Sequence, residues 1–117
     1  MFSGTFNGTT NVSRFLNGPD GVALDVAPLV IPFECELIAL SATSEQGAGT
    51  AVWDAEVYVN GAFLTNASIS LNNVDKAFQL GFPTVANLSA NDELALYINR
   101  IASGVRKPRI NAWFRRA

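Results

Sequence analysis

The chain has 117 residues, of which 49% are hydrophobic and 15% charged, and its formal net charge is −2. That length suits one domain, and so apolar a composition excludes a disordered chain, which has too little hydrophobic surface to fold. The chain has no histidine and a single cysteine, Cys35. An internal disulfide, a Ser-His-Asp triad and the usual zinc site are therefore excluded, and we expect stability to come from packing or from oligomerisation.

The first segment, residues 1–21, is rich in Gly, Asn, Ser and Thr and shows neither the helical nor the strand period. The sequence predicts an irregular N-terminal arm. Its large aromatic side chains, Phe2, Phe6 and Phe15, would be costly to leave in water, so we expect the arm to dock on a surface. That surface is either the edge of the domain's own core or a neighbouring protein, and both readings stay open.

The residues after the arm show the patterns of β-structure. Pro28 and Pro32 lack the N–H that a central strand donates, so residues 22–32 are predicted to be an edge strand or an extended connection. A strand rich in β-branched and aliphatic residues is predicted at 34–44, and a turn-rich loop at 45–50.

The strongest local signal is a hairpin centred on Asn60-Gly61. Residues 51–60 alternate in the manner of a half-buried strand, with Trp53, Ala55, Val57 and Val59 on the apolar side. Asn-Gly suits the positive φ angles of a type I′ turn, so this strand is predicted to return tightly into residues 62–65.

Four further segments complete the predicted strands. Residues 67–73 can continue the hairpin's return strand, residues 74–80 read as another strand, and residues 94–99 place Leu94, Leu96 and Ile98 on one side. In the last strand, 108–116, Ile110, Ala112 and Phe114 alternate with Arg109, Asn111, Trp113 and Arg115.

Short strands separated by turns, with no helical stripe longer than two turns, indicate a sandwich or a barrel. We predict an all-β, antiparallel, jelly-roll-like β-sandwich of about eight strands at residues 22–117, preceded by the irregular arm at 1–21. An immunoglobulin-like sandwich is the second choice, although the Cys, Trp, Cys spacing of true immunoglobulin domains is absent.

Paired carboxylates are the remaining route to hydrolysis, at Glu34 with Glu36, Asp54 with Glu56, and Asp92 with Glu93. The spacing of the first two pairs puts both acids on one strand face, which is also how a solvated face looks. We therefore predict no catalytic activity and no cofactor or metal, with a loop calcium ion as an open alternative.

The charges are divided along the chain. Residues 1–99 hold ten acids and two bases, a charge of −8, whereas residues 100–117 hold six bases and no acid. A body this acidic would repel phosphate, and the basic segment lacks the spacing of an amphipathic helix, so we expect neither nucleic acid nor membrane as a partner.

The basic strand is instead expected to meet the acidic surface of a second copy, in a head-to-tail contact that can close into a ring such as a trimer. The alternative is that its cations pair with acids on adjacent strands of the same subunit. The residues expected at the subunit interface are Arg100, Arg106, Lys107, Arg109, Trp113, Arg115 and Arg116.

The order of segments resembles a known group of proteins. IPFECELIALSATS after a Pro-containing entry, the hairpin at VYVNG, ANDELALYIN and the closing PRINAWFRR are similar to the small jelly-roll domains of tailed-bacteriophage virions, over residues 28–116. That resemblance implies a capsid decoration (cement) protein or the head of a fibre, usually a homotrimer.

Decoration is the favoured reading, since the sequence shows neither a collagen-like stalk nor a long coiled coil. We therefore expect a homotrimer on the outer capsid surface, assembled in the host cytoplasm, with the major capsid protein as its partner and Phe2, Phe6 and Phe15 as anchors.

Two other functions stay open. A receptor-binding or fibre-head domain would recognise a cell-surface glycan, with Trp53, Tyr58, Tyr97 or Trp113 as stacking platforms. A carboxylate glycosidase would depend on Asp54 and Glu56.

Overall fold

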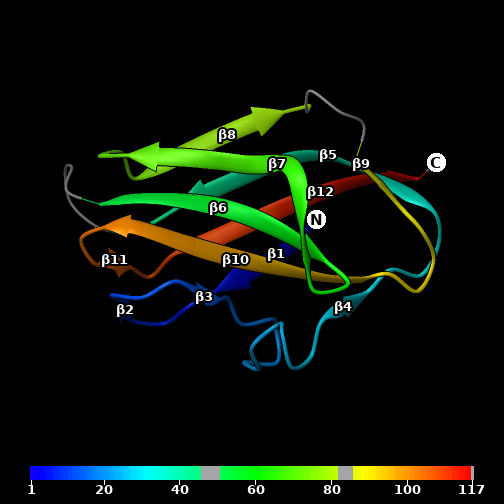
Figure 1. Cartoon of the computed structure of the whole chain (residues 1–117), viewed down its shortest axis with the longest axis horizontal. Helices are drawn as coiled ribbons and strands as arrows, with labels where there is room; N and C mark the ends of the chain where they lie inside the picture. Colours follow the sequence, from blue (N-terminus) through cyan, green and yellow to red (C-terminus); the bar gives the residue numbers. More distant parts are fainter. Residues whose placement is uncertain (46–50, 82–85, 117) are drawn as a thin grey trace.

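The computed structural model describes residues 1–45, 51–81 and 86–116, and these residues form twelve strands and no helix (Figure 1). No helix that could cross a membrane is found among them. The strands are β1 (Phe2–Thr5), β2 (Thr9–Thr10), β3 (Arg14–Phe15), β4 (Leu29–Val30), β5 (Cys35–Thr43), β6 (Val52–Val59), β7 (Ala62–Asn72), β8 (Lys76–Leu80), β9 (Ala86–Leu88), β10 (Glu93–Ala102), β11 (Val105–Arg106) and β12 (Arg109–Arg116).

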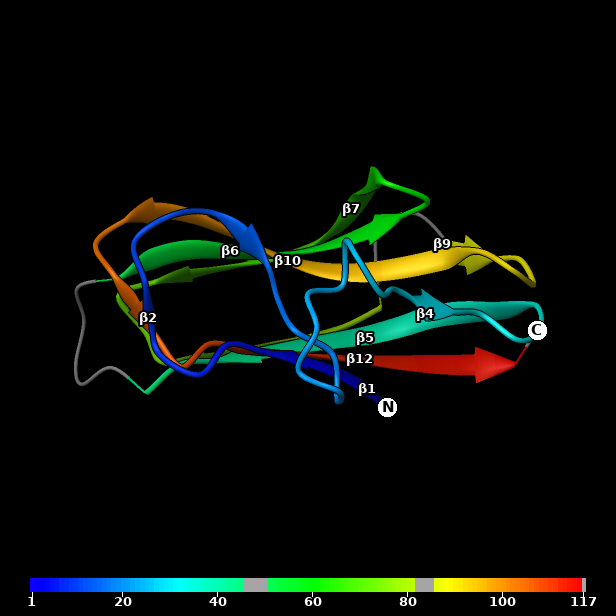
Figure 2. The ribbon, with the colours of Figure 1, turned by 90° about the horizontal axis from the view of Figure 1, so that it is seen from below.

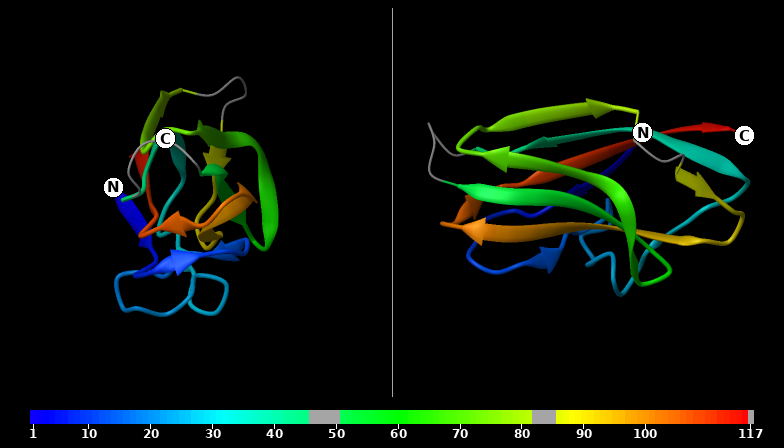
Figure 3. Two further views of the ribbon diagram at one scale, coloured as in Figure 1. Left: turned by 90° about the vertical axis from the view of Figure 1, so that its left-hand side faces the viewer. Right: turned by 45° about the horizontal axis from the view of Figure 1, so that its top comes forward.

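Two five-stranded antiparallel sheets pack face to face as the layers of a sandwich (Figure 2). One, which we call the β12 sheet, has the order β1-β12-β5-β8, with β9 also paired to β5. The other, the β10 sheet, has the order β3-β10-β6-β7, with β4 also paired to β10. A small ribbon of β2 and β11 lies at one end, and Figure 3 shows the two layers from that end.

The connectivity is that of a jelly roll. When β1, β3, β5, β6, β7, β8, β10 and β12 are counted from 1 to 8 in chain order, the sheets read 1-8-3-6 and 2-7-4-5. Apart from the β6–β7 hairpin, strands consecutive in this count alternate between the sheets, in the pattern of two interlocked Greek keys. The predicted all-β, antiparallel jelly-roll-like sandwich is confirmed.

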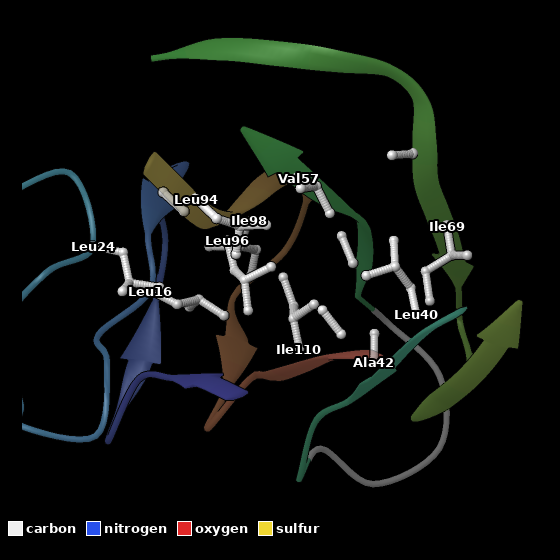
Figure 4. Close-up of a cluster of buried hydrophobic side chains, with 14 of the residues drawn as sticks. Leu16, Leu24, Leu40, Ala42, Val57, Ile69, Leu94, Leu96, Ile98 and Ile110 are labelled. Carbon is white, nitrogen blue, oxygen red and sulfur yellow. The ribbon is translucent and has the colours of Figure 1, made fainter. Parts of the chain in front are cut away.

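The core lies between the sheets and is built from the apolar side of each long strand (Figure 4). In β6, Trp53 and Val57 are fully buried, as the alternation predicted, and Leu94, Leu96 and Ile98 of β10 are buried beside them. The facing layer contributes Leu37, Leu40 and Ala42 from β5 and Ile110 and Ala112 from β12.

Residues 1–21 are not a separate arm. β1 pairs with β12, with Phe2 opposite Ala112, and β3 pairs with β10, with Phe15 opposite Tyr97, so the segment enters both sheets. Leu16 is fully buried in the common core. The boundary predicted at residue 21 is therefore corrected. The signal was missed because strands of two to four residues are too short to show a period.

The hairpin prediction is confirmed. Val59 pairs with Ala62, and the two residues between them have the positive φ angles that a type I′ turn requires, 52° at Asn60 and 81° at Gly61. In the stretch 22–32, by contrast, the only strand is β4, which pairs with the first residues of β10. An edge position suits a strand flanked by Pro28 and Pro32. The predicted turn-rich loop at 45–50 falls mostly outside the described residues.

Candidate functional site

Two cations of the C-terminal region pair with acids of the same chain. Arg115 lies opposite Glu36 across β12 and β5, and its Nη2 is 2.9 Å from Glu36 Oε1. The Lys107 Nζ is 3.4 Å from Glu45 Oε2. For these two side chains the structure shows the intrachain pairing that the sequence left open as the alternative to a subunit interface.

Two more cations have other contacts within the chain. The Nε of Arg100 donates a hydrogen bond to the carbonyl oxygen of Ser103, at 2.8 Å. The guanidinium of Arg116 lies 4.6 Å from the centroid of the Phe33 ring, a cation–π contact. Neither group has an acid partner among the described residues.

The remaining cations gather where β12 begins. Arg106 and Arg109 are exposed, and their guanidinium groups have no hydrogen bond or ion pair within the described part of the chain. Lys76 is equally free, and it shares this end because Arg109 and Lys76 both lie opposite Thr43 in the sheet. Beside them is an open hollow of about 560 Å³ that Lys107 and Arg109 help to line. We call Lys76, Arg106 and Arg109 the basic end.

Trp113, the aromatic member of the predicted interface, lies on the outer side of the β12 sheet. Its ring centroid is 6.2 Å from that of Phe78, in an edge-to-face arrangement. Phe78 is 63% exposed and Trp113 is half-buried, so the pair forms an apolar patch open to contact. Contiguous apolar patches on a surface can mark interaction sites, whereas single exposed apolar side chains are common.

The three phenylalanines predicted as anchors are held by their own domain. Phe2, Phe6 and Phe15 are partly buried against the core, and Phe6 also lies 4.2 Å below the guanidinium of Arg14. Of the two readings left open by the sequence, the structure places these side chains on the edge of the chain's own core.

A cluster of four rings covers part of the outer side of the β10 sheet. Phe15 lies 5.1 Å from Tyr58 and 4.7 Å from Tyr97, Tyr58 lies 5.0 Å from Tyr97, and Phe63 lies 6.0 Å from Tyr58, all between ring centroids. We call these residues the aromatic face. In the predicted strand 51–60, the alternation places Tyr58 on the solvent-facing side, and this was the sequence signal for an exposed aromatic ring. The alternation does not reveal that four strands bring their aromatic rings together.

Acids, and no bases, accompany the aromatic face. Glu56 lies opposite Tyr97, and its pKa is raised, chiefly by burial and also by Asp54, against a lowering by the hydrogen bond from Asn99. Asp54 accepts a hydrogen bond of 2.7 Å from the Ser70 hydroxyl. In the described part of this sheet, Arg14 and Arg100 take the positions opposite the core residues Ile98 and Trp53, so neither basic residue points outward from it.

Next to the aromatic face is a hollow of about 320 Å³, which we call the acidic hollow. Its lining residues are Phe15, Leu24, Asp25, Pro28, Tyr58, Asn60, Gly61, Glu93 and Ala95. The Asn60 amide is already used, since it donates to Asp92 and accepts from the backbone N–H of Glu93, at 3.0 and 2.9 Å. The carboxylates of Asp25 and Glu93 have no such partner within the described residues.

The other described residues that could bind a ligand or react are either buried or too far apart to form a site. Trp53 is fully buried, so the prediction that its ring could serve as a stacking platform is wrong. Cys35 is 5% exposed, and its pKa is raised by burial and then by the charge of Asp92, which disfavours the reactive thiolate. The described residues include no group of three or more acid, Cys or His side chains able to hold a metal ion.

Comparison with known proteins gives little. No protein-family model matches the chain, and no curated protein matches it. One similar solved structure is titled "Crystal Structure of FLHE"; it is 15% identical, with a TM-score of 0.45, and the match covers 99% of this chain and 96% of that one. At this TM-score the likeness carries no argument about fold or function.

Proposed function

We propose that this protein is a structural component of a bacteriophage virion, a decoration protein that binds the outside of the capsid as a homotrimer and stabilises the shell. It is assembled in the host cytoplasm, and its partners are its own copies and the major capsid protein. The proposal assigns it no catalytic reaction and no cofactor.

The observation that carries the proposal is the jelly-roll connectivity of the two sheets. The virion domains that its segments resemble are jelly rolls, and the described residues build one apolar core between two such sheets. Because one fold hosts many functions, the fold alone does not indicate a function, and features of the surface are needed as well. The surface has three features suited to binding proteins: the exposed Phe78–Trp113 patch, the basic end and the aromatic face.

The proposal assigns the contact with the capsid to the body of the domain, whereas the sequence had assigned it to residues 1–21. Phe2 and Phe6 pack partly against their own core, which leaves less of each ring for a partner. The Phe78–Trp113 patch takes that role in the proposal, since it is apolar, outward and rimmed by polar side chains such as Asn111 and Ser41.

The test is cosedimentation of the purified protein with capsids that lack it, together with light scattering of the free protein. We expect saturable binding of trimers and a higher temperature of capsid disruption after binding. A Phe78→Ser variant should bind more weakly, whereas Val26→Ser, which changes another exposed apolar side chain, should bind as the wild type does. A strict monomer at high concentration that fails to bind capsids would refute the proposal.

Glycan recognition by a fibre head is the second candidate, and the aromatic face favours it. Tyr58 and Tyr97 are half-buried neighbours on the outer side of a sheet, beside a hollow that carries carboxylates. Aromatic rings with adjacent polar groups are a common means of holding sugars by stacking and hydrogen bonds. Binding of the protein to a glycan array, lost in Tyr58→Ala and combined with failure to bind capsids, would favour this function over decoration.

A further inference from the structure

Charged side chains that lack a partner are not spread evenly over the molecule. Among the described residues, the carboxylates without a hydrogen bond or ion pair are those of Asp25, Glu34, Asp75 and Glu93. Two of these four, Asp25 and Glu93, line the acidic hollow. The cations without a partner, Lys76, Arg106 and Arg109, form the basic end. Each site thus holds charges of one sign that no other described residue of the chain pairs.

The two sites cannot satisfy each other within one molecule. Glu93, at the acidic hollow, begins β10, and β10 ends at Ala102, just before β11 and the basic end (Figure 1). A strand of this length spans about 30 Å, which is much further than an arginine side chain reaches. If cations of the basic end occupy the acidic hollow, they therefore have to come from another molecule.

The lining of the acidic hollow suits a guanidinium group. Two carboxylates can accept its N–H groups in the fork geometry that makes arginine–carboxylate contacts strong. The rings of Phe15 and Tyr58, whose centroids are 5.1 Å apart, supply apolar walls on which the flat guanidinium can stack. None of the lining residues is basic, and the volume of about 320 Å³ is at the small end for a ligand site, a size suited to side chains.

We propose that the acidic hollow of one copy receives the guanidinium groups of Arg106 and Arg109 from a second copy of this chain. The inference rests on the self-association in the proposed function and names the contact that produces it. The contact joins two different surfaces, so it is heterologous when the same two copies do not exchange both contacts, and a closed ring built from it then has at least three copies. A symmetric contact of hollow with hollow would instead bring acids against acids.

The experiment uses two neutralised variants of the full chain, Asp25→Asn/Glu93→Gln and Arg106→Gln/Arg109→Gln. Each variant alone is expected to weaken self-association about tenfold or more, as measured by sedimentation velocity over a concentration series. Mixed in equal amounts, they should form a one-to-one dimer and no larger species, because only one competent pair of surfaces remains. Glu34→Gln/Asp75→Asn and Arg116→Gln are the matched controls and should assemble as the wild type does.

The outcomes separate this inference from the proposed function. If the wild type forms trimers that both hollow and basic-end variants leave unchanged, or if the mixture forms no dimer, the inference is overturned while capsid decoration stands. A wild type that is monomeric at every concentration overturns it as well. Circular dichroism and urea unfolding of each variant establish that the altered residues, all exposed, leave the fold intact.

Discussion

Shortening Leu16 to alanine tests most sharply whether residues 1–21 belong to the folded domain. Leu16 is 0% exposed, its N–H donates to the carbonyl of Leu96 at 2.9 Å, and its carbonyl accepts from the N–H of Leu24 at 2.9 Å. The packing around it is tight, since a Cβ added at Gly4 would come within 3.1 Å of the Leu16 Cβ. Little room is left for the structure to collapse into a new cavity.

The expected cost of Leu16→Ala follows from this environment. Removing buried leucine side-chain atoms typically lowers the free energy of unfolding by about 3–5 kcal/mol, with the cavity adding to the lost transfer energy. Equilibrium urea unfolding measures it directly. With a denaturant slope of about 1–3 kcal/mol per molar urea, the midpoint should fall by at least about 1 M.

The control lies in the same segment. Val12 is 56% exposed, so Val12→Ala should change the free energy of unfolding by no more than about 0.5 kcal/mol. If residues 1–21 were a detached arm, both substitutions would be equally mild. A loss below about 1 kcal/mol for Leu16→Ala, at an unchanged denaturant slope, would refute the integration of this segment.

Three further predictions concern the turn, the aromatic face and a surface ion pair. Gly61→Ala should lower the free energy of unfolding by about 1 kcal/mol, because φ is 81° there; an unchanged urea midpoint would contradict the type I′ turn. Burial raises the pKa of Glu56, so the folded state binds its proton more tightly than the unfolded state and the wild type loses stability as pH rises through that pKa. Glu56→Gln should therefore be more stable than the wild type at neutral pH, with the gap closing in acid, and a less stable variant at pH 7 would reverse the sign. In a double-mutant cycle of Arg115→Gln with Glu36→Gln, the coupling should stay below about 1 kcal/mol, because Arg115 is 66% exposed; a coupling of several kcal/mol would contradict this.

The long strands could be predicted because their side chains alternate over enough residues. β6 has eight residues and buries every second side chain from Trp53 to Val57, and β10 has ten residues and buries Leu94, Leu96 and Ile98, with Ala95 buried as well. The short strands could not. β1 pairs with β12 near the other end of the chain, and the Ser3 hydroxyl donates to Asn111 Oδ1 at 2.6 Å. A local sequence pattern cannot indicate a pairing between residues that are 108 positions apart. The hairpin was predicted correctly from a short signal, because Asn and Gly favour the positive φ angles that its turn requires.

The residue types of the candidate sites could be predicted from the sequence, but the way in which the fold brings those residues together could not. The cations of the last segment are concentrated enough to be noticed, but which of them are free depends on register. Arg115 is paired because Glu36 lies opposite it on β5, while Arg109 lies opposite Thr43 and has no acid to meet. The aromatic face joins rings from β3, β6, β7 and β10, so it exists only after the sheet has formed.

A decoration protein sits on the outside of the capsid, so the location of this chain on intact virions is the decisive observation. Immunogold electron microscopy with an antibody raised against the folded protein is the measurement. We expect label distributed over the whole capsid surface. Label confined to the tail or its fibres, or virions without any label, would contradict it.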